Sequence, residues 1–169
     1  MYYIGIDIGS TTIKCVVINE QNEILYKNYM RHKSSITKSL ITLVKGISDV
    51  FNGEKMYFNF TGSAGMLLAN DIGIQFTQEV ISATKAIKLI DPSINCCIEL
   101  GGEDAKIIFS TCKKLEQRMN GTCAGGTGAF IDQMATLLDV DSAQLNELAK
   151  NYEKIYPIAS RCGVFAKSD

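Results

Sequence analysis

Apolar positions recur at two different spacings in the first part of the chain, and these spacings predict strands and helices. Short apolar or alternating runs at Tyr3–Ile8, Ile13–Ile18 and Ile24–Tyr29 predict three strands. Between residues 36 and 50 the apolar residues recur every three or four positions instead, which predicts a helix that ends near Asn52-Gly53. The chain therefore begins with three strands and a helix.

The same two spacings predict further elements as far as Pro92, which we expect to mark a boundary between two lobes. Alternation from Met56 to Phe60 predicts a strand, a short helix is expected after Gly65, and Glu79–Ile90 reads as another helix before Asp91-Pro92. We expect a first lobe of about residues 1–92 in the order β-β-β-α-β-α-α. Residues 93–169 then form a second lobe.

The second lobe begins as a copy of the first. The segment Ile6–Lys14 is echoed 92 residues later by Ile98–Lys106, with a carboxylate, glycine and lysine at matching positions. Apolar runs at Ile94–Leu100 and Ala105–Phe109 predict the same pair of strands around a glycine turn. A cysteine loop, two helical stretches and a strand-like piece follow. We therefore expect two similar lobes, the second incomplete.

The two glycine turns are candidate phosphate sites, because tight turns expose consecutive backbone amides. Asp7 precedes the first turn, and a carboxylate beside a polyphosphate requires a cation such as Mg²⁺ between them. In the second turn Glu103 or Asp104 is expected to handle Mg²⁺ or the attacking water. The candidate nucleotide-binding residues are Gly9, Ser10, Thr11, Thr12, Lys14, Gly101, Gly102, Gly125, Gly126 and Thr127.

Six cysteines without a secretory segment indicate reduced thiols or metal ligands. Cys123 lies in a glycine-rich loop before a helix predicted over Ala129–Leu138, whose N-terminus would stabilise a thiolate. Cys162 lies in a second loop-like segment, and two ligands from one chain leave a four-ligand cluster half complete. Of the other cysteines, Cys112 is expected to be a surface thiol and three in apolar runs are expected to be buried: Cys15, Cys96 and Cys97.

Composition narrows the class of protein. The apolar fraction of 46% fits a globular protein with a core, and a net charge of −1 without like-charge runs argues against a nucleic-acid or membrane partner. No apolar run approaches the roughly 18 residues of a membrane helix, so a cytoplasmic protein is expected. The one histidine, His32, precedes a helix in a polar stretch and is expected to be solvated.

The motifs together resemble a known family. Residues 5–11 and their echo at residues 99–106 are similar to the acetate-kinase, sugar-kinase, actin and heat-shock-ATPase superfamily. With residues 119–130 and 160–166, the match narrows to the activator ATPases of 2-hydroxyacyl-CoA dehydratases and related benzoyl-CoA reductase subunits, the BadF/BadG/BcrA/BcrD type. The resemblance implies an α/β, ribonuclease H-like, actin-type ATPase fold with duplicated lobes, the second truncated.

The resemblance also implies a function. Activators of this family bind ATP or ADP with Mg²⁺ and donate a low-potential electron to a dehydratase or reductase component. Each protomer of a homodimer gives two cysteines, here matching Cys123 and Cys162, to one 4Fe-4S cluster.

The turns of this chain depart from those of the short activators. Gly102-Glu103 stands where they have Gly-Gln, and Thr61–Gly65 departs from their Thr-Gly-Tyr-Gly-Arg. Both features resemble the N-terminal part of long fused activases, so the partner cysteines are expected from a second copy or another segment of the same protein. Two other functions stay open: a small-molecule kinase of the sugar-kinase type, and a nucleotide-dependent regulatory or assembly module without electron transfer.

Overall fold

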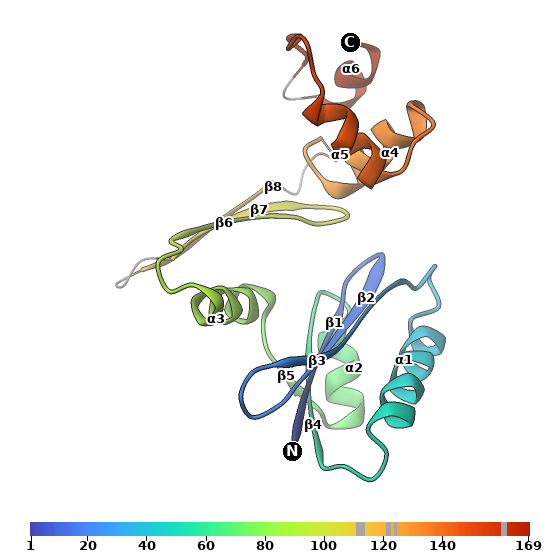
Figure 1. The fold of residues 1–169 in the computed structure, drawn as a ribbon, viewed down its shortest axis with the longest axis vertical. Coiled ribbons are helices and arrows are strands. Elements are labelled where there is room, and N and C mark those ends of the chain that lie inside the picture. The colour runs from blue at the N-terminus through green and yellow to red at the C-terminus, as the bar shows by residue number, and fades with distance from the viewer. Residues whose placement is uncertain (111–113, 121–122, 124, 160–161) are drawn as a thin grey trace. The chain divides into compact units, whose positions relative to one another are not determined.

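The computed structural model describes residues 1–110, 114–120, 123, 125–159 and 162–169. They divide into two compact units, Met1–Ile90 (unit 1) and Asp91–Asp169 (unit 2), shown in Figure 1. Cys112 lies outside the described residues. Over the described ranges, none of the helices combines the length and apolar character that a membrane crossing needs.

Unit 1 is a mixed sheet with helices. In chain order its elements are β1 (Tyr2–Ile8), β2 (Thr12–Ile18), β3 (Ile24–Arg31), α1 (Ile36–Val50), β4 (Met56–Thr61), α2 (Gly65–Ile72), β5 (Gln75–Phe76) and α3 (Glu79–Ile90). The strand order is β3-β2-β1-β4-β5; β1 to β3 form an antiparallel meander, and β4 and β5 run parallel to β1. Since parallel neighbours need a crossover, α1 connects β3 to β4 and α2 connects β4 to β5.

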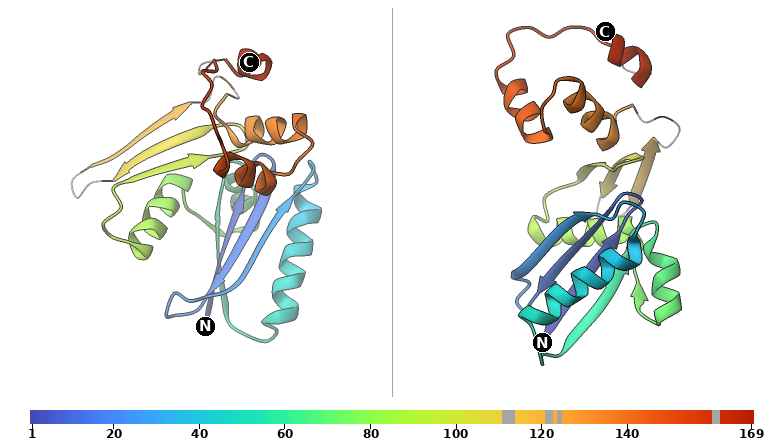
Figure 2. Two further views of the ribbon diagram at one scale, coloured as in Figure 1. Left: turned by 45° about the horizontal axis from the view of Figure 1, so that its top comes forward. Right: turned by 90° about the vertical axis from the view of Figure 1, so that its right-hand side faces the viewer.

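One face of this sheet forms the core of unit 1. Along β1 the isoleucines at positions 4, 6 and 8 are buried while the residues between them are more exposed, as the period of two requires. Helices α1 and α2 contribute to the same cluster, and Figure 2 shows α1 running along the sheet. The core residues are Ile4, Ile6, Ile8, Ile13, Cys15, Val17, Leu43, Ile47, Phe51, Phe60 and Ala69.

Unit 2 begins with an antiparallel meander and continues with helices. Its elements are β6 (Cys96–Leu100), β7 (Ala105–Ser110), β8 (Leu115–Asn120), α4 (Gly128–Leu137), α5 (Ser142–Lys150) and α6 (Gly163–Ser168), and the strand order is β6-β7-β8 (Figure 2). Two of the helices begin at side-chain caps. Thr127 accepts a hydrogen bond from the Phe130 amide at the start of α4, and Asp141 forms a capping box with Gln144 at the start of α5.

Three elements differ from the sequence-based prediction. Strand β5 has only two residues, and β8 carries charged residues in place of an apolar run, so neither produces a strand pattern. After Asn120 the described residues form helices and loops, and α6 stands among them where a strand-like piece was expected. A six-residue segment is too short for hydrophobic periodicity to separate a strand from a helix.

Two expectations about burial are wrong. Cys15 is buried as expected, but Cys96 is exposed and Cys97 is half-buried. Both lie on β6, an edge strand of a three-stranded sheet, where residues of one face alternate with exposed residues. His32 is buried, with 5% of its surface exposed, because its ring packs under the turn between β1 and β2.

Candidate functional site

The turn between β1 and β2 brings together the first group of predicted phosphate residues. The Gly9 amide donates to the Thr12 carbonyl at 2.9 Å, which closes a tight turn. Ser10 and Thr11 are exposed at its tip, whereas Thr12 is buried. The turn therefore presents two hydroxyl side chains and the backbone between them to solvent, as a phosphate site needs.

Asp7 and Lys14 form an ion pair across the two strands that lead into this turn. They lie opposite each other in the β1–β2 register, and Lys14 Nζ is 2.7 Å from Asp7 Oδ2. Both side chains are partly exposed, and such a pair contributes about 0–1 kcal/mol to stability. Because the ion pair is weak, a bound cation can take the place of Lys14 beside Asp7, and a phosphate can take the place of Asp7 beside Lys14.

A second loop reaches Asp7 from the neighbouring strand. Because β4 runs parallel to β1, with Thr61 opposite Asp7, the loop after Thr61 lies at the same edge of the sheet, where open α/β sheets bind ligands. Gly62 has φ +94°, and a Cβ on it would lie 2.5 Å from Asp7 Oδ1. The Thr61 hydroxyl is buried without a hydrogen-bond partner among the described residues. No local sequence pattern signals the approach of Gly62 to Asp7, because it depends on the parallel pairing of β1 and β4.

In unit 2 the turn between β6 and β7 folds around a buried lysine. Lys106 is buried, and its Nζ lies 3.3 Å from Asp104 Oδ2 and 3.8 Å from Glu99 Oε1. Asp104 also turns back toward Gly101, where a Cβ would lie 2.5 Å from Asp104 Oδ1. Glu103 is exposed, and Gly102 is half-buried.

The two units repeat one cross-strand pair. Asp7 lies opposite Lys14 in unit 1, and Glu99 lies opposite Lys106 in unit 2, at the positions that the sequence repeat relates. In both units the carboxylate is the penultimate residue of the first strand, and the lysine lies near the start of the second strand. The sequence repeat is thus also a repeat of strand register.

The two candidate cluster ligands of unit 2 are Cys123, in the glycine-rich loop before α4, and Cys162, at the start of α6. The Gly125 amide donates to Cys123 Sγ at 3.4 Å, and the Gly163 amide donates to the same sulfur. These two hydrogen bonds, that of Gly125 first, lower the pKa of the exposed Cys123 thiol. Cys162 directly precedes Gly163 and is the N-cap residue of α6.

Main-chain contacts connect the cysteines to the glycine turn of unit 2. The Gly128 amide, the first of α4, donates to the Gly101 carbonyl at 2.7 Å. At the other end of the same loop, a Cβ on Gly125 would lie 3.3 Å from the Gly163 nitrogen. A Cβ on Gly163 would in turn lie 3.4 Å from the ring of Phe130 in α4. The candidate phosphate turn, α4 and the cysteine-bearing segments therefore pack as one continuous series.

Comparison with known proteins assigns the family. Residues 4–169 match the model of the BadF/BadG/BcrA/BcrD ATPase family. The chain belongs to this family. It is 30% identical over 175 residues to the (R)-2-hydroxyglutaryl-CoA dehydratase activating ATPase of Acidaminococcus fermentans, covering 100% of this chain and 66% of the relative. The chain thus spans just under two thirds of that relative's length.

Two solved structures of similar sequence agree with the fold. The crystal structure of component A of the A. fermentans dehydratase superposes with a TM-score of 0.82 at 30% identity, over 99% of this chain and 66% of that one. The activator of 2-hydroxyisocaproyl-CoA dehydratase from Clostridium difficile, with bound ADPNP, gives 0.81 at 28%, over 99% and 63%. The expected α/β, ribonuclease H-like fold of the actin type is confirmed.

The remaining predicted residues of this family member lie at the start of α4. Thr127 is fully buried, and its hydroxyl accepts the Phe130 amide at 3.4 Å. Gly125 accepts a hydrogen bond from the Asn120 side chain at 3.2 Å, and Gly126 has φ +82° with open space where a Cβ would stand. Of these three, Gly126 leaves the most room for a ligand to approach the backbone.

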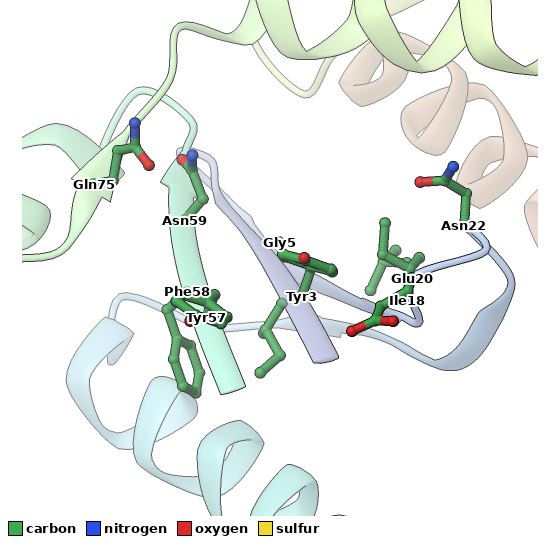
Figure 3. A pocket seen from close by; sticks show the side chains of 11 residues that line it. Tyr3, Gly5, Ile18, Glu20, Asn22, Tyr57, Phe58, Asn59 and Gln75 are labelled. Atoms are coloured by element: carbon green, nitrogen blue, oxygen red, sulfur yellow. The ribbon is translucent and has the colours of Figure 1, made fainter. Parts of the chain in front are cut away.

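A cavity of about 710 Å³ lies elsewhere on unit 1 and includes none of the predicted site residues. Figure 3 shows Tyr3, Tyr57 and Asn59 among its lining side chains, on the sheet face opposite the core. The rings of Tyr3 and Tyr57 stack with centroids 5.8 Å apart. The cavity is therefore an aromatic surface of the sheet and is separate from the glycine turn.

We expect the Cys123 thiol to react at lower pH than an ordinary thiol. The two amide hydrogen bonds stabilise its thiolate, so its alkylation by iodoacetamide should reach its maximal rate at a lower pH than that of a short unfolded cysteine peptide. Burial raises the pKa of Cys15 to about 11, so Cys15 should stay unlabelled until the protein unfolds. Mass spectrometry of labelled peptides across neutral pH measures both. Equal pH profiles for Cys123 and the peptide would contradict the assigned hydrogen bonds.

Proposed function

We propose that this chain carries the nucleotide and cluster sites of an ATP-hydrolysing activator that donates a low-potential electron to a 2-hydroxyacyl-CoA dehydratase-type partner. The observation that supports it most is the series of contacts from the Gly101 turn through α4 to Cys123 and Cys162. Coupling of ATP hydrolysis to electron transfer requires such a connection between the two sites. A nucleotide shifts the protein between two conformations only if it binds them with different affinity, and the conformational change must then reach the cysteines.

In this proposal each glycine turn contributes a phosphate-binding backbone, and the turns belong to ATPase lobes at residues 1–92 and 93–169. Asp7 is the proposed Mg²⁺ ligand, and the unpartnered Thr61 hydroxyl beside it fits a site that gains a polar partner when occupied. The Lys14 ammonium group then leaves Asp7 and pairs with a phosphate oxygen. The exposed hydroxyls of Ser10 and Thr11 donate to the same anion.

In unit 2 we propose that Asp104 and Glu103 divide two roles. Asp104 is held by Lys106 and so has a fixed position from which to orient a water or Mg²⁺. Glu103 is exposed and is free to approach the phosphates. Gly101 and Gly102 supply the turn backbone, and Gly125, Gly126 and Thr127 form a second backbone surface at the start of α4.

The residues present also fit a 4Fe-4S cluster. Cys123 and Cys162 adjoin the same Gly163 amide, and amides that stabilise a thiolate favour metal ligation. Among the described residues no group of three His, Cys, Asp or Glu side chains could hold a metal ion. A cluster held here would supply one-electron transfer, and its other two ligands come from a second copy in a homodimer or from another segment of the same protein.

The names of the relatives support the proposed partner. The two named above are a dehydratase activating ATPase and a dehydratase activator. We therefore propose a dehydratase or reductase component as the electron acceptor, in the cytoplasm.

We expect the 169-residue chain to bind Mg²⁺-ADP at least about tenfold more weakly than a form extended to the relatives' full length, here called the longer form. Both glycine turns are present in the shorter chain, but the match leaves about a third of the relatives' length uncovered. Affinity depends on how many contacts are organised together and how fully the pocket encloses the base. Calorimetry on both forms measures the difference. Equal, tight binding would show that residues 1–169 hold the base by themselves.

A further inference from the structure

His32 directly contacts the glycine turn of unit 1 from below. Its ring Nε2 lies 3.1 Å from the Gly9 carbonyl oxygen, and its main-chain amide donates to the Thr11 carbonyl at 3.3 Å. One residue thus holds two carbonyls of the same short turn. The residue itself is fixed as well, because the Ser35 amide donates to the His32 carbonyl at 2.8 Å.

The contact determines the tautomer of the ring. A carbonyl oxygen only accepts, so Nε2 must carry the proton that it donates to Gly9. In the neutral ring Nδ1 is then an acceptor, and this atom is buried without a hydrogen-bond partner among the described residues. His32 is the single histidine of the chain, so its ring signals can be assigned without ambiguity.

The hydrogen bond to Gly9 also sets the direction of the next amide. In a planar trans peptide the N–H points opposite to the C=O, so a Gly9 carbonyl held toward His32 directs the Ser10 amide away from it. Ser10 is exposed, whereas His32 is buried on the other side of the turn. The Ser10 amide therefore faces the side from which a phosphate approaches.

We propose that His32 is a positioning residue for this turn: by donating to the Gly9 carbonyl, its imidazole fixes the Ser10 amide for a nucleotide phosphate. The inference rests on the proposed function in that the anion is the phosphate of Mg²⁺-ATP or Mg²⁺-ADP. Without the ring, the Gly9 carbonyl loses its donor and the Gly9–Ser10 peptide is held less firmly, so part of the binding energy is spent on ordering it.

The first test needs no variant and no nucleotide. Nitrogen NMR of the 169-residue chain, labelled at its single histidine, should show a proton on the ring Nε2. A ring that carries its proton on Nδ1 alone would have no donor for the Gly9 carbonyl and would overturn the inference.

The second test separates positioning from folding. In the longer form, His32→Leu should weaken Mg²⁺-ADP binding about tenfold while leaving the affinity for adenosine unchanged, since adenosine carries no phosphate. His32→Gln, whose amide nitrogen reaches the position of Nε2, should restore binding to within about threefold. Equal Mg²⁺-ADP affinity of wild type and His32→Leu would overturn the inference, as would equal losses for ADP and adenosine. If the wild type itself bound no Mg²⁺-ADP, the proposed function would fall first, and the tautomer result would still report whether the ring holds the turn.

Discussion

Replacing either Cys123 or Cys162 by alanine in the longer form is expected to abolish iron binding when the protein is prepared without oxygen. A four-iron cluster shared by two cysteine pairs gives about two irons per pair. Removing one cysteine leaves a single ligand in the pair, and the Gly163 amide cannot replace a thiolate because it only donates. Iron analysis and the ultraviolet-visible spectrum of each variant give the result.

Cys96→Ala is the matched control for this experiment. Cys96 is an exposed thiol of the same unit but lies on β6, outside the cysteine loop, so its loss should leave the iron content unchanged. Iron retained in the double variant Cys123→Ala/Cys162→Ala would show that these residues are not the ligands. A wild type without iron would instead favour a small-molecule kinase or a regulatory module.

Replacing Asp7 by asparagine is expected to lower ATP turnover on the order of 100-fold, which corresponds to about 2.7 kcal/mol of transition-state stabilisation. Asparagine keeps the shape of the side chain but loses the charge that would hold Mg²⁺. Stability should change little, because the Asp7–Lys14 pair that is lost is partly exposed. Steady-state hydrolysis at saturating Mg²⁺ and chemical denaturation of the longer form separate the two effects.

Asp49→Asn provides a charge-matched control on the exposed face of α1 and should leave turnover unchanged. Asp104→Asn in unit 2 should also lower turnover, since Asp104 is the carboxylate that Lys106 holds in place. Unchanged turnover in Asp7→Asn at saturating Mg²⁺ would mean that Asp7 has no catalytic role.

Much of unit 1 could be predicted because its signals are local. The alternating isoleucines of β1 and the periodic apolar face of α1 depend on neighbouring residues alone, and both elements lie where the sequence predicts them. The charge-bearing strand β8 has no such signal, since its strand structure comes from pairing with β7. Local pattern predicts elements that bury one face.

The environment of the candidate site depended on contacts that no local pattern contains. Gly62 meets Asp7 only because β4 pairs in parallel with β1, and His32 is buried only because the chain leaves β3 beneath the glycine turn. The Gly163 amide reaches Cys123 across 40 residues of sequence. The residues with candidate chemistry were recognisable in the sequence, whereas their supporting contacts required the fold.

The contact between Gly128 and Gly101 has a practical consequence for mutagenesis. It joins two main-chain groups of the same polypeptide, the Gly128 amide and the Gly101 carbonyl, and neither residue has a side chain. Replacing side chains around it therefore removes neither the donor nor the acceptor. A systematic alanine scan that passes over glycines would find no position responsible for it. The bond is accessible only at its own atoms: by a Cβ at Gly128, which would stand 3.1 Å from the Gly101 oxygen, or by an ester in place of the Gly128 amide. Chemical synthesis or semisynthesis is therefore the route by which this link between turn and helix can be cut without altering any side chain.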